Sequence, residues 1–447
     1  MITHITANFF VSEFSVREVA MPARDFICAF AATRSNCGGT ALCQRSYHMP
    51  DVPQLCSAFR QDAFQLFDTE RSSHDLPINL VVKQLAAATN LSPITIAGDY
   101  ASLALGPGRI SFSDYLKLRL FDKSYYGDND RRDVVGRRRN LSLVKAANYR
   151  IDWMGLFANK IALNSYLNAY GFETIPTVAI YSAGLSSSSS RVLASVDALR
   201  AFLRNADNYP LFCKPVEGYQ SLGSISLKCF QPNENLLETF DGRALAVDRF
   251  IAEVSSHYKE GYLFQRRLVP HAEIRRLCGD RLATIRIVTI LADSEPAVFR
   301  ACWKIPAGVN AADNYWRQNN LLARIDPATW RVTQVISGTG LELRHHTHHP
   351  DTGEQLIGIE VPNGAAAAQL ALSGSRLMRD MPLIGWDVAS LDAGPIIVEA
   401  NEKPDFFLNQ LADARGILDR EFIEFLKSQE RKAAARTRAI KRESRQL

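Results

Sequence analysis

The residues most suited to chemistry lie near the C-terminus, in the segment LIGWDVASLDAGPIIVEANEKP at 383–404. Strand-like runs on both sides of residues 392–394 predict a β-hairpin. If those three residues form the turn, pairing is symmetric about the middle one, and Asp387 lies directly opposite Glu399 on one face. Strand alternation places Asn401 on the face of Glu399, and it places on the other, core-facing side Ile396, Val398 and Ala400.

This hairpin predicts a magnesium site. Two carboxylates directly opposite one another destabilise a sheet unless something neutralises them. Two acids and one amide supply the hard oxygen ligands that suit Mg²⁺, a cation that usually binds together with phosphates. The alternative is a solvated polar hairpin face with Lys403 as counter-ion, but Trp386 and the aliphatic neighbours indicate burial.

A second group of residues suited to chemistry begins at Lys214-Pro215 and continues through Gly218, Gly223 and Ser224. The lysine ends a predicted strand and could pair with phosphate oxygens, while amides of the small-residue loop approach them without Cβ interference. The loop matches neither GxxxxGK[ST] nor GxGxxG, so a plain hairpin turn remains the alternative.

The elements that must position these residues alternate between helix and strand. Apolar residues at helical spacing over 163–170, closed by Gly171, predict a helix, and IPTVAIY predicts a strand after it. Further strands are expected in LFCKP, ISLKCF, GYLFQRRL, ATIRIVTIL and PAVFRACWKI. Helices that flank a mostly antiparallel sheet system predict an α+β fold.

Composition bounds the class of protein. A chain of 447 residues with 47% apolar and 22% charged residues is ordinary for a globular protein of two to four domains. No apolar run is long enough to cross a membrane, and the N-terminus lacks a signal-peptide pattern. The eight cysteines form no CxxC pair, so we expect reduced thiols and a cytoplasmic protein.

The net charge of +5 is concentrated at one end of the chain. Residues 427–447 hold eight Lys or Arg and two Glu, so the rest of the chain is close to neutral. We therefore expect no binding of nucleic acid by the core. The tail itself is expected to be a frayed helical extension, with weak contact to a membrane surface or another anionic partner as a possible role.

The order of these parts resembles the ATP-grasp superfamily: Lys160, Lys214, a Gly/Ser loop, then the acidic hairpin. The runs ATIRIVTI, ADN, HPDTG, IEVP and IGWDVAS…GPIIVEANEKP resemble more closely the sugar-transfer-associated ATP-grasp proteins, over about residues 111–426. Those proteins are similar to glutathione synthetase and the ribosomal-protein glutamate ligases. The resemblance implies two α/β lobes that clasp a nucleotide, with a mostly helical N-terminal extension.

Four regions are expected, of which the middle two follow from this resemblance and the two ends from their own residue patterns. Residues 1–110 would form an N-terminal helical and irregular cap, and 111–205 the first part of the ATP-grasp region. Residues 206–426 would form the nucleotide- and metal-binding lobes, and 427–447 the basic tail.

The resemblance also implies ATP and one or two Mg²⁺ as cofactors, and it assigns roles to individual residues. Lys160 and Lys214 would contact the nucleotide phosphates, beneath a closing loop that includes Glu217, Gly218, Gly223 and Ser224. A hinge would hold adenine through Gln265, Arg266 and Leu268. The sequence departs from the family here, because an acidic residue is common where Gln265 and Arg266 stand.

The remaining implied roles concern ribose, phosphate and metal. Glu273 would take the ribose hydroxyls, and Arg286 would hold the γ-phosphate and the acyl-phosphate oxygens. Asp387, Glu399 and Asn401 match the family's magnesium ligands. A second departure follows Asn314, where YWRQNN replaces a glycine pair that related ligases often have.

Two further candidates come from the residues themselves. Arg300 and Lys304 share strand parity and could face the phosphates or water, and we take Arg300 as a candidate catalytic residue. The tract RHHTHH at 344–349 resembles a metal tract, but adjacent histidines on a turn seldom converge on one ion. A solvated or substrate-contacting loop is therefore favoured for it.

These observations predict an ATP-dependent carboxylate–amine ligase that acts through an acyl phosphate and releases ADP and phosphate. Its partners would be a small-molecule carboxylate and amine, and an oligomer is possible. The alternatives are an ATP-dependent phosphotransferase on the same fold and a non-catalytic nucleotide-binding partner in glycan assembly. No Ser-His-Asp or Cys-His constellation points to nucleophilic catalysis by the protein.

Overall fold

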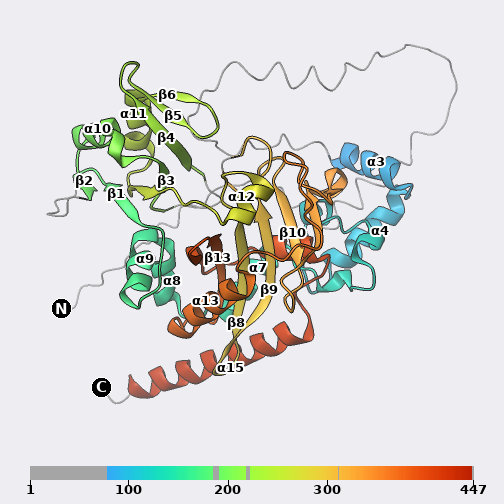
Figure 1. Cartoon of the computed structure of the whole chain (residues 1–447). Helices are drawn as coiled ribbons and strands as arrows, with labels where there is room; N and C mark the ends of the chain where they lie inside the picture. Colours follow the sequence, from blue (N-terminus) through green and yellow to red (C-terminus); the bar gives the residue numbers. More distant parts are fainter. Residues whose placement is uncertain (1–77, 185–190, 218–221, 311, 445–447) are drawn as a thin grey trace, which may run out of the picture.

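The computed structural model describes residues 78–184, 191–217, 222–310 and 312–444 (Figure 1). The fold is α+β, as predicted, and two seven-stranded sheets form its framework. All strand pairs are antiparallel except the short pair of β1 and β2. The expected cap at 1–110 is described only from residue 78, and the described part holds the helices α3 (Ile78–Thr89) and α4 (Pro93–Ala104).

The first sheet has the strand order β2-β1-β7-β3-β4-β5-β6. Its strands are β1 (Thr177–Tyr181), β2 (Val192–Leu193), β3 (Leu211–Pro215), β4 (Ile225–Gln231), β5 (Leu236–Thr239), β6 (Ala244–Ala246) and β7 (Tyr262–Arg266). Two amphipathic helices, α10 (Val196–Arg204) and α11 (Val247–His257), pack on it through Leu199, Phe250 and Val254. This packing buries one face of the sheet. The opposite face, which carries Phe212 and Lys214, is directed toward the second sheet.

The second sheet has the strand order β12-β11-β10-β9-β8-β13-β14. Its strands are β8 (Thr284–Leu291), β9 (Pro296–Ile305), β10 (Leu321–Ile325), β11 (Val332–Ser337), β12 (Arg344–His345), β13 (Leu383–Leu391) and β14 (Gly394–Asn401). Helix α13 (Gly364–Leu377) covers one face with small residues, so that its Gly374 lies against the ring of Trp386. A Cβ at Gly374 would lie 2.5 Å from that ring, which explains the glycine.

Helices cover the other face of the second sheet. Those nearest the sheet are α14 (Phe406–Asp413), α7 (Arg137–Ala147) and the first half of α15 (Arg420–Glu443). The N-terminal helices α3, α4, α5 (Phe112–Lys117) and α6 (Lys123–Tyr126) pack beside them. Three further helices, α8 (Ile151–Ala158), α9 (Lys160–Ala169) and α12 (Ala272–Cys278), lie near the junction of the two sheets (Figure 1). No helix among the described residues has the length and apolar character needed to cross a membrane.

The predicted basic tail continues α15 as one helix up to Glu443 (Figure 1). Its first half is anchored by Phe422 and Phe425, which are buried against Phe299 and its neighbours. From Ala434 to Glu443 every residue is exposed, so this end of the helix makes little contact with the body.

The acidic hairpin has the predicted pairing at its functional end but a different turn. Leu391 pairs with Gly394, so the turn has two residues rather than three. Val398 is an extra residue in β14, and this β-bulge restores the direct pairing of Asp387 with Glu399. The predicted core position of Val398 is therefore wrong: the bulge turns its side chain into the cleft described next.

Candidate functional site

A cleft lies between the two sheets and receives side chains from both. The space between its walls, with the open mouth included, is about 1010 Å³. The first sheet and the segment after it contribute Phe212, Lys214, Pro215, Leu222, Ser224, Ser226, Arg266, Arg267 and Leu268. The second sheet and its neighbours contribute Leu282, Thr284, Lys304, Ala312, Asp313, Asp387, Val398 and Glu399, and Lys160 and Ile175 complete the lining.

Asp387 is the most strongly held acid of this cleft. Its two carboxylate oxygens accept from Arg286 Nε at 2.6 Å and from Arg286 Nη2 at 2.9 Å, and Lys304 Nζ lies 3.2 Å from Oδ2. Arg286 is available because β8 pairs with β13 so that Arg286 lies opposite Asp387. Burial alone would raise the pKa of Asp387, but these two cations hold it at about 2. The group is an anion at any physiological pH.

Glu399, the other carboxylate of the pair, is more open. Lys160 Nζ lies 3.8 Å from its Oε1, and one third of its side chain, 33%, is exposed. Asn401 does not reach the cleft lining; its amide instead donates to Gly385 O at 3.5 Å. The structure thus brings Asp387 and Glu399 together and leaves Asn401 beside them.

These residues fit a magnesium ion. Mg²⁺ is commonly held by one or two carboxylates and completed by water and substrate phosphates, so it needs no all-protein cage. Asp387 and Glu399 supply that pair, facing each other across two strands in a cleft that is open to a ligand. Within the described residues no three His, Cys, Asp or Glu side chains form a metal cluster.

Lys214 presents a cation to the cleft. It ends β3, its residue is 8% exposed, and burial lowers the pKa of its ammonium to about 8, with Glu399 opposing and Lys160 reinforcing the shift. Among the residues that the structure describes, none makes a hydrogen bond or ion pair with this ammonium. A buried cation of this kind is prepared for an anion from outside the protein.

The loop after Lys214 has its predicted small residues, of which Gly218 lies outside the described part. Gly223 has a φ of +73°, and a Cβ there would lie 2.4 Å from the Tyr258 hydroxyl oxygen, so only glycine fits without a shift. The Tyr262 hydroxyl donates to Gly223 O at 2.7 Å and fixes this point. Ser224 lines the cleft, whereas Glu217 is exposed and does not.

The predicted adenine hinge is partly at the cleft. Arg266 and Leu268 line it, together with Arg267 of the same segment, whose guanidinium carbon lies 3.8 Å from the centroid of the Phe240 ring. Gln265 is fully buried behind the lining, where its Nε2 donates to Ile175 O at 3.4 Å.

Two predicted site residues lie away from the cleft. Glu273, in the first turn of α12, pairs with Arg276 one turn later at 3.1 Å and is not among the lining residues. Arg300 has the predicted strand parity with Lys304 but lies about 13 Å further along β9. There its guanidinium pairs with Asp419 at 2.5 Å, so the prediction that Arg300 faces the phosphates is wrong.

Arg286 lies beside the predicted site but contacts Asp387 instead of lining the cleft. Its guanidinium is directed at Asp387, and the residue is not among those that line the cleft. It acts here on the charge and orientation of Asp387, and its contact with a γ-phosphate stays a prediction.

Among the lining residues that sequence reasoning did not single out are Thr284 and Asp313. Asp313 Oδ2 accepts from the Thr284 amide at 2.7 Å and from the Thr284 hydroxyl at 2.5 Å, and Lys304 Nζ lies 3.8 Å from Oδ1. The run ADN at 312–314 was a signal of resemblance, but nothing in its pattern shows that residue 313 reaches the start of β8.

Comparison with known proteins identifies the family. The family model described as sugar-transfer associated ATP-grasp matches residues 138–424. No curated protein matches the chain at the significance required.

Among solved structures, similarity is recorded to D-alanine–D-alanine ligase from Helicobacter pylori, at 14% identity and a TM-score of 0.33, over 62% of this chain and 61% of that one. L-amino acid ligase from Bacillus licheniformis matches at 12% identity and a TM-score of 0.28, over 56% of this chain and 41% of that one. The matched part is thus less than two thirds of either protein.

Proposed function

Because the chain belongs to the sugar-transfer-associated ATP-grasp family, we propose that it is an ATP-dependent carboxylate–amine ligase. The observation that supports this most is the convergence of Lys160, Lys214 and Lys304 with the acid pair Asp387 and Glu399 on one cleft between two sheets. Such a cleft suits a triphosphate with its magnesium, and the acid and amine substrates would be small molecules.

The first step would be attack of a carboxylate oxygen of one substrate on the γ-phosphorus of ATP. The bond from that phosphorus to the β,γ-bridging oxygen breaks, ADP leaves, and an acyl phosphate forms. Phosphoryl transfer of this kind needs little covalent help from the protein, because catalysis comes from positioning and from cations already in place. Lys160, Lys214 and Lys304 are such cations.

Asp387 and Glu399 would hold one or two Mg²⁺, with Asn401 beside them. When bound, the metal neutralises charge on the phosphates and orients them. Arg286 and Lys304 prepare this site by keeping Asp387 ionised and fixed within its strand pair. In the second step an amine nitrogen would attack the acyl carbon, and phosphate would leave as the amide forms.

In the test, the purified protein is incubated with ATP, Mg²⁺, hydroxylamine and a mixture of amino acids as candidate acids. The ligase proposal expects ADP release together with hydroxamates, because hydroxylamine traps acyl phosphates. ATP consumption with a stable phosphorylated product and no hydroxamate would instead identify a phosphotransferase.

A further inference from the structure

Asp313 is a carboxylate in a cleft otherwise built to receive phosphate, and the steps proposed above do not use it. Its side chain is 13% exposed and lines the cleft. An anion in this position repels a triphosphate, so its natural counterpart is a group that donates protons or carries positive charge. Lys304 is one such group, and among the proposed substrates only the amine is another.

The two oxygens of Asp313 are in different situations. Oδ2 is fully engaged by the amide and hydroxyl of Thr284, at 2.7 and 2.5 Å. Oδ1 has only the ammonium of Lys304, at 3.8 Å, beyond hydrogen-bond reach. Within the described part of the chain no group hydrogen-bonds to Oδ1. The Thr284 contacts therefore fix the carboxylate and leave one oxygen for a ligand.

Asp313 is also close to the predicted reaction centre. The same Lys304 ammonium contacts Asp387 Oδ2 at 3.2 Å and Asp313 Oδ1 at 3.8 Å. The two oxygens can lie no further apart than the sum of these distances. A substrate between the magnesium ligand Asp387 and Asp313 could thus touch both regions of the cleft.

The loop that holds Asp313 is fixed from behind. Asn320, which is 1% exposed, donates from Nδ2 to the carbonyls of Ala312 at 2.8 Å and Asn314 at 2.7 Å, the residues immediately before and after Asp313. Its Oδ1 accepts from the Ala307 amide at 2.9 Å. One buried amide thus holds both flanks of Asp313.

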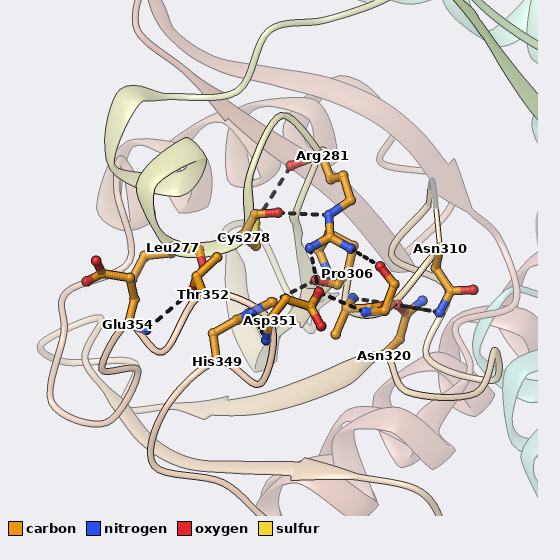
Figure 2. A network of polar contacts seen from close by, with 12 residues as sticks. Leu277, Cys278, Arg281, Pro306, Asn310, Asn320, His349, Asp351, Thr352 and Glu354 are labelled. Carbon is orange, nitrogen blue, oxygen red and sulfur yellow. Dashed lines mark hydrogen bonds and ion pairs between the residues drawn. The ribbon is translucent and has the colours of Figure 1, made fainter. Parts of the chain in front are cut away.

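A second part of this network extends to the loop with the sequence HPDTG, as Figure 2 shows. Asp351 accepts from the Gly308 amide at 2.9 Å and from Arg281 at 2.8 Å, while Arg281 donates back to Gly308 O at 2.7 Å. The buried His349 contacts Pro306 O at 3.0 Å. His349 is therefore held by the backbone of Pro306. The network fixes the HPDTG loop at 349–353 before any ligand binds.

We propose that Asp313 is the catalytic residue that receives the attacking amine of the second step, through Oδ1. This inference rests on the proposed ligase function. The amine nitrogen forms its bond to the acyl carbon while the bond from that carbon to the phosphate oxygen breaks. Before this attack, Asp313 Oδ1 takes the extra proton of the substrate ammonium and passes it to solvent. Phosphate then leaves with the electron pair of the broken bond, and the second proton, released by nitrogen as the amide forms, passes to that phosphate.

The environment of Asp313 agrees with this role. Burial raises the pKa of Asp313 above its ordinary value, and Lys304 and Thr284 only partly oppose the effect, while the charge of Asp387 adds to it. A carboxylate with a raised pKa is a better proton acceptor than an exposed one. Thr284, which orients it, is a positioning residue.

The experiment compares two nucleophiles with the full-length protein, ATP, Mg²⁺ and a mixture of the twenty amino acids with glucosamine. Hydroxylamine is largely unprotonated at neutral pH and needs no base, whereas the amines in the mixture carry a proton. In Asp313→Asn we expect hydroxamate formation within about threefold of wild type and amide formation lowered by at least ~10²-fold. Raising the pH from 7 to 9.5 should restore part of the amide yield.

Asp197→Asn is the matched control, because Asp197 is 91% exposed on α10, and both of its yields should equal wild type. Should Asp313→Asn fail to fold, Thr284→Val serves instead, with an expected loss of about tenfold in amide alone.

Equal losses of hydroxamate and amide in the folded variant would overturn the proposal for Asp313 and leave the ligase intact. Absence of hydroxamate in the wild type would refute the ligase function itself. Hydroxamate without any amide from the wild type would also overturn the role of Asp313.

Discussion

Replacement of Arg286 by methionine tests how the acid pair is stabilised. A pKa of Asp387 held at about 2, against an ordinary 3.8, corresponds to about 2 kcal/mol of folding free energy. This contribution is fully present above pH 4 and is lost as the pH falls toward 2. Removing one partner of a buried ion pair typically costs about 3–5 kcal/mol, but Lys304 remains 3.2 Å from Asp387. We therefore expect a loss of about 2–3 kcal/mol at pH 7.

Urea unfolding followed by tryptophan fluorescence measures this loss, since Trp303 and Trp386 are both fully buried in the second sheet. Arg200→Met is the control, because it breaks only exposed ion pairs with Asp197 and Asp248 and should cost less than about 1 kcal/mol. The difference between wild type and Arg286→Met should shrink as the pH is lowered from 4 to 2. A loss below 0.5 kcal/mol at pH 7, or one independent of pH in this range, would refute the electrostatic reasoning.

Four further predictions concern the cleft. Asp387→Asn and Glu399→Gln should each lower ATP turnover by at least ~10²-fold with ATP in excess, measured as ADP release; unchanged turnover would contradict the metal assignment. Lys214→Met should weaken ATP binding about 10- to 100-fold in calorimetry. In the wild type, ATP should raise the pKa of Lys214 from about 8, so binding should take up protons and weaken as the pH rises above 8; buffer-independent binding heats at pH 8.5 would count against this. Gly223→Ala should weaken ATP binding by forcing the loop away from Tyr258, with little change in the melting temperature, and equal affinity would show that the loop does not approach the nucleotide.

The acidic hairpin shows how far sequence reasoning reached. The assumed turn paired Asp387 with Glu399, and the apolar neighbours indicated burial, which holds for Asp387 but not for the one-third exposed Glu399. It could not locate the bulge at Val398, because a bulge depends on how the strand fits its neighbours and not on local pattern. The predicted turn was one residue too long, and the bulge compensated for that error.

The residues that sequence reasoning misplaced or missed depend on tertiary contacts. Strand parity placed Arg300 on the same face as Lys304. Parity does not show which end of a strand reaches a cleft, nor that Asp419 lies near Arg300 at the other end and pairs with it. Asp313 reaches the site because Asn320 holds the residues on either side of it, over separations of 8 and 6 residues, and because Thr284 at the start of β8 binds its carboxylate, over 29 residues. Such contacts leave no periodic signal.

Transfer of isotopic oxygen from substrate to phosphate tests the central claim most directly. The protein is incubated with ATP, Mg²⁺ and amino acids whose carboxylates are labelled with ¹⁸O, and the released phosphate is analysed by mass spectrometry. Attack of a carboxylate on the γ-phosphorus predicts phosphate that contains one ¹⁸O atom for each amide formed, and its loss in Asp387→Asn. Amide formation accompanied by phosphate without ¹⁸O would contradict the account, since no acyl phosphate would then have formed.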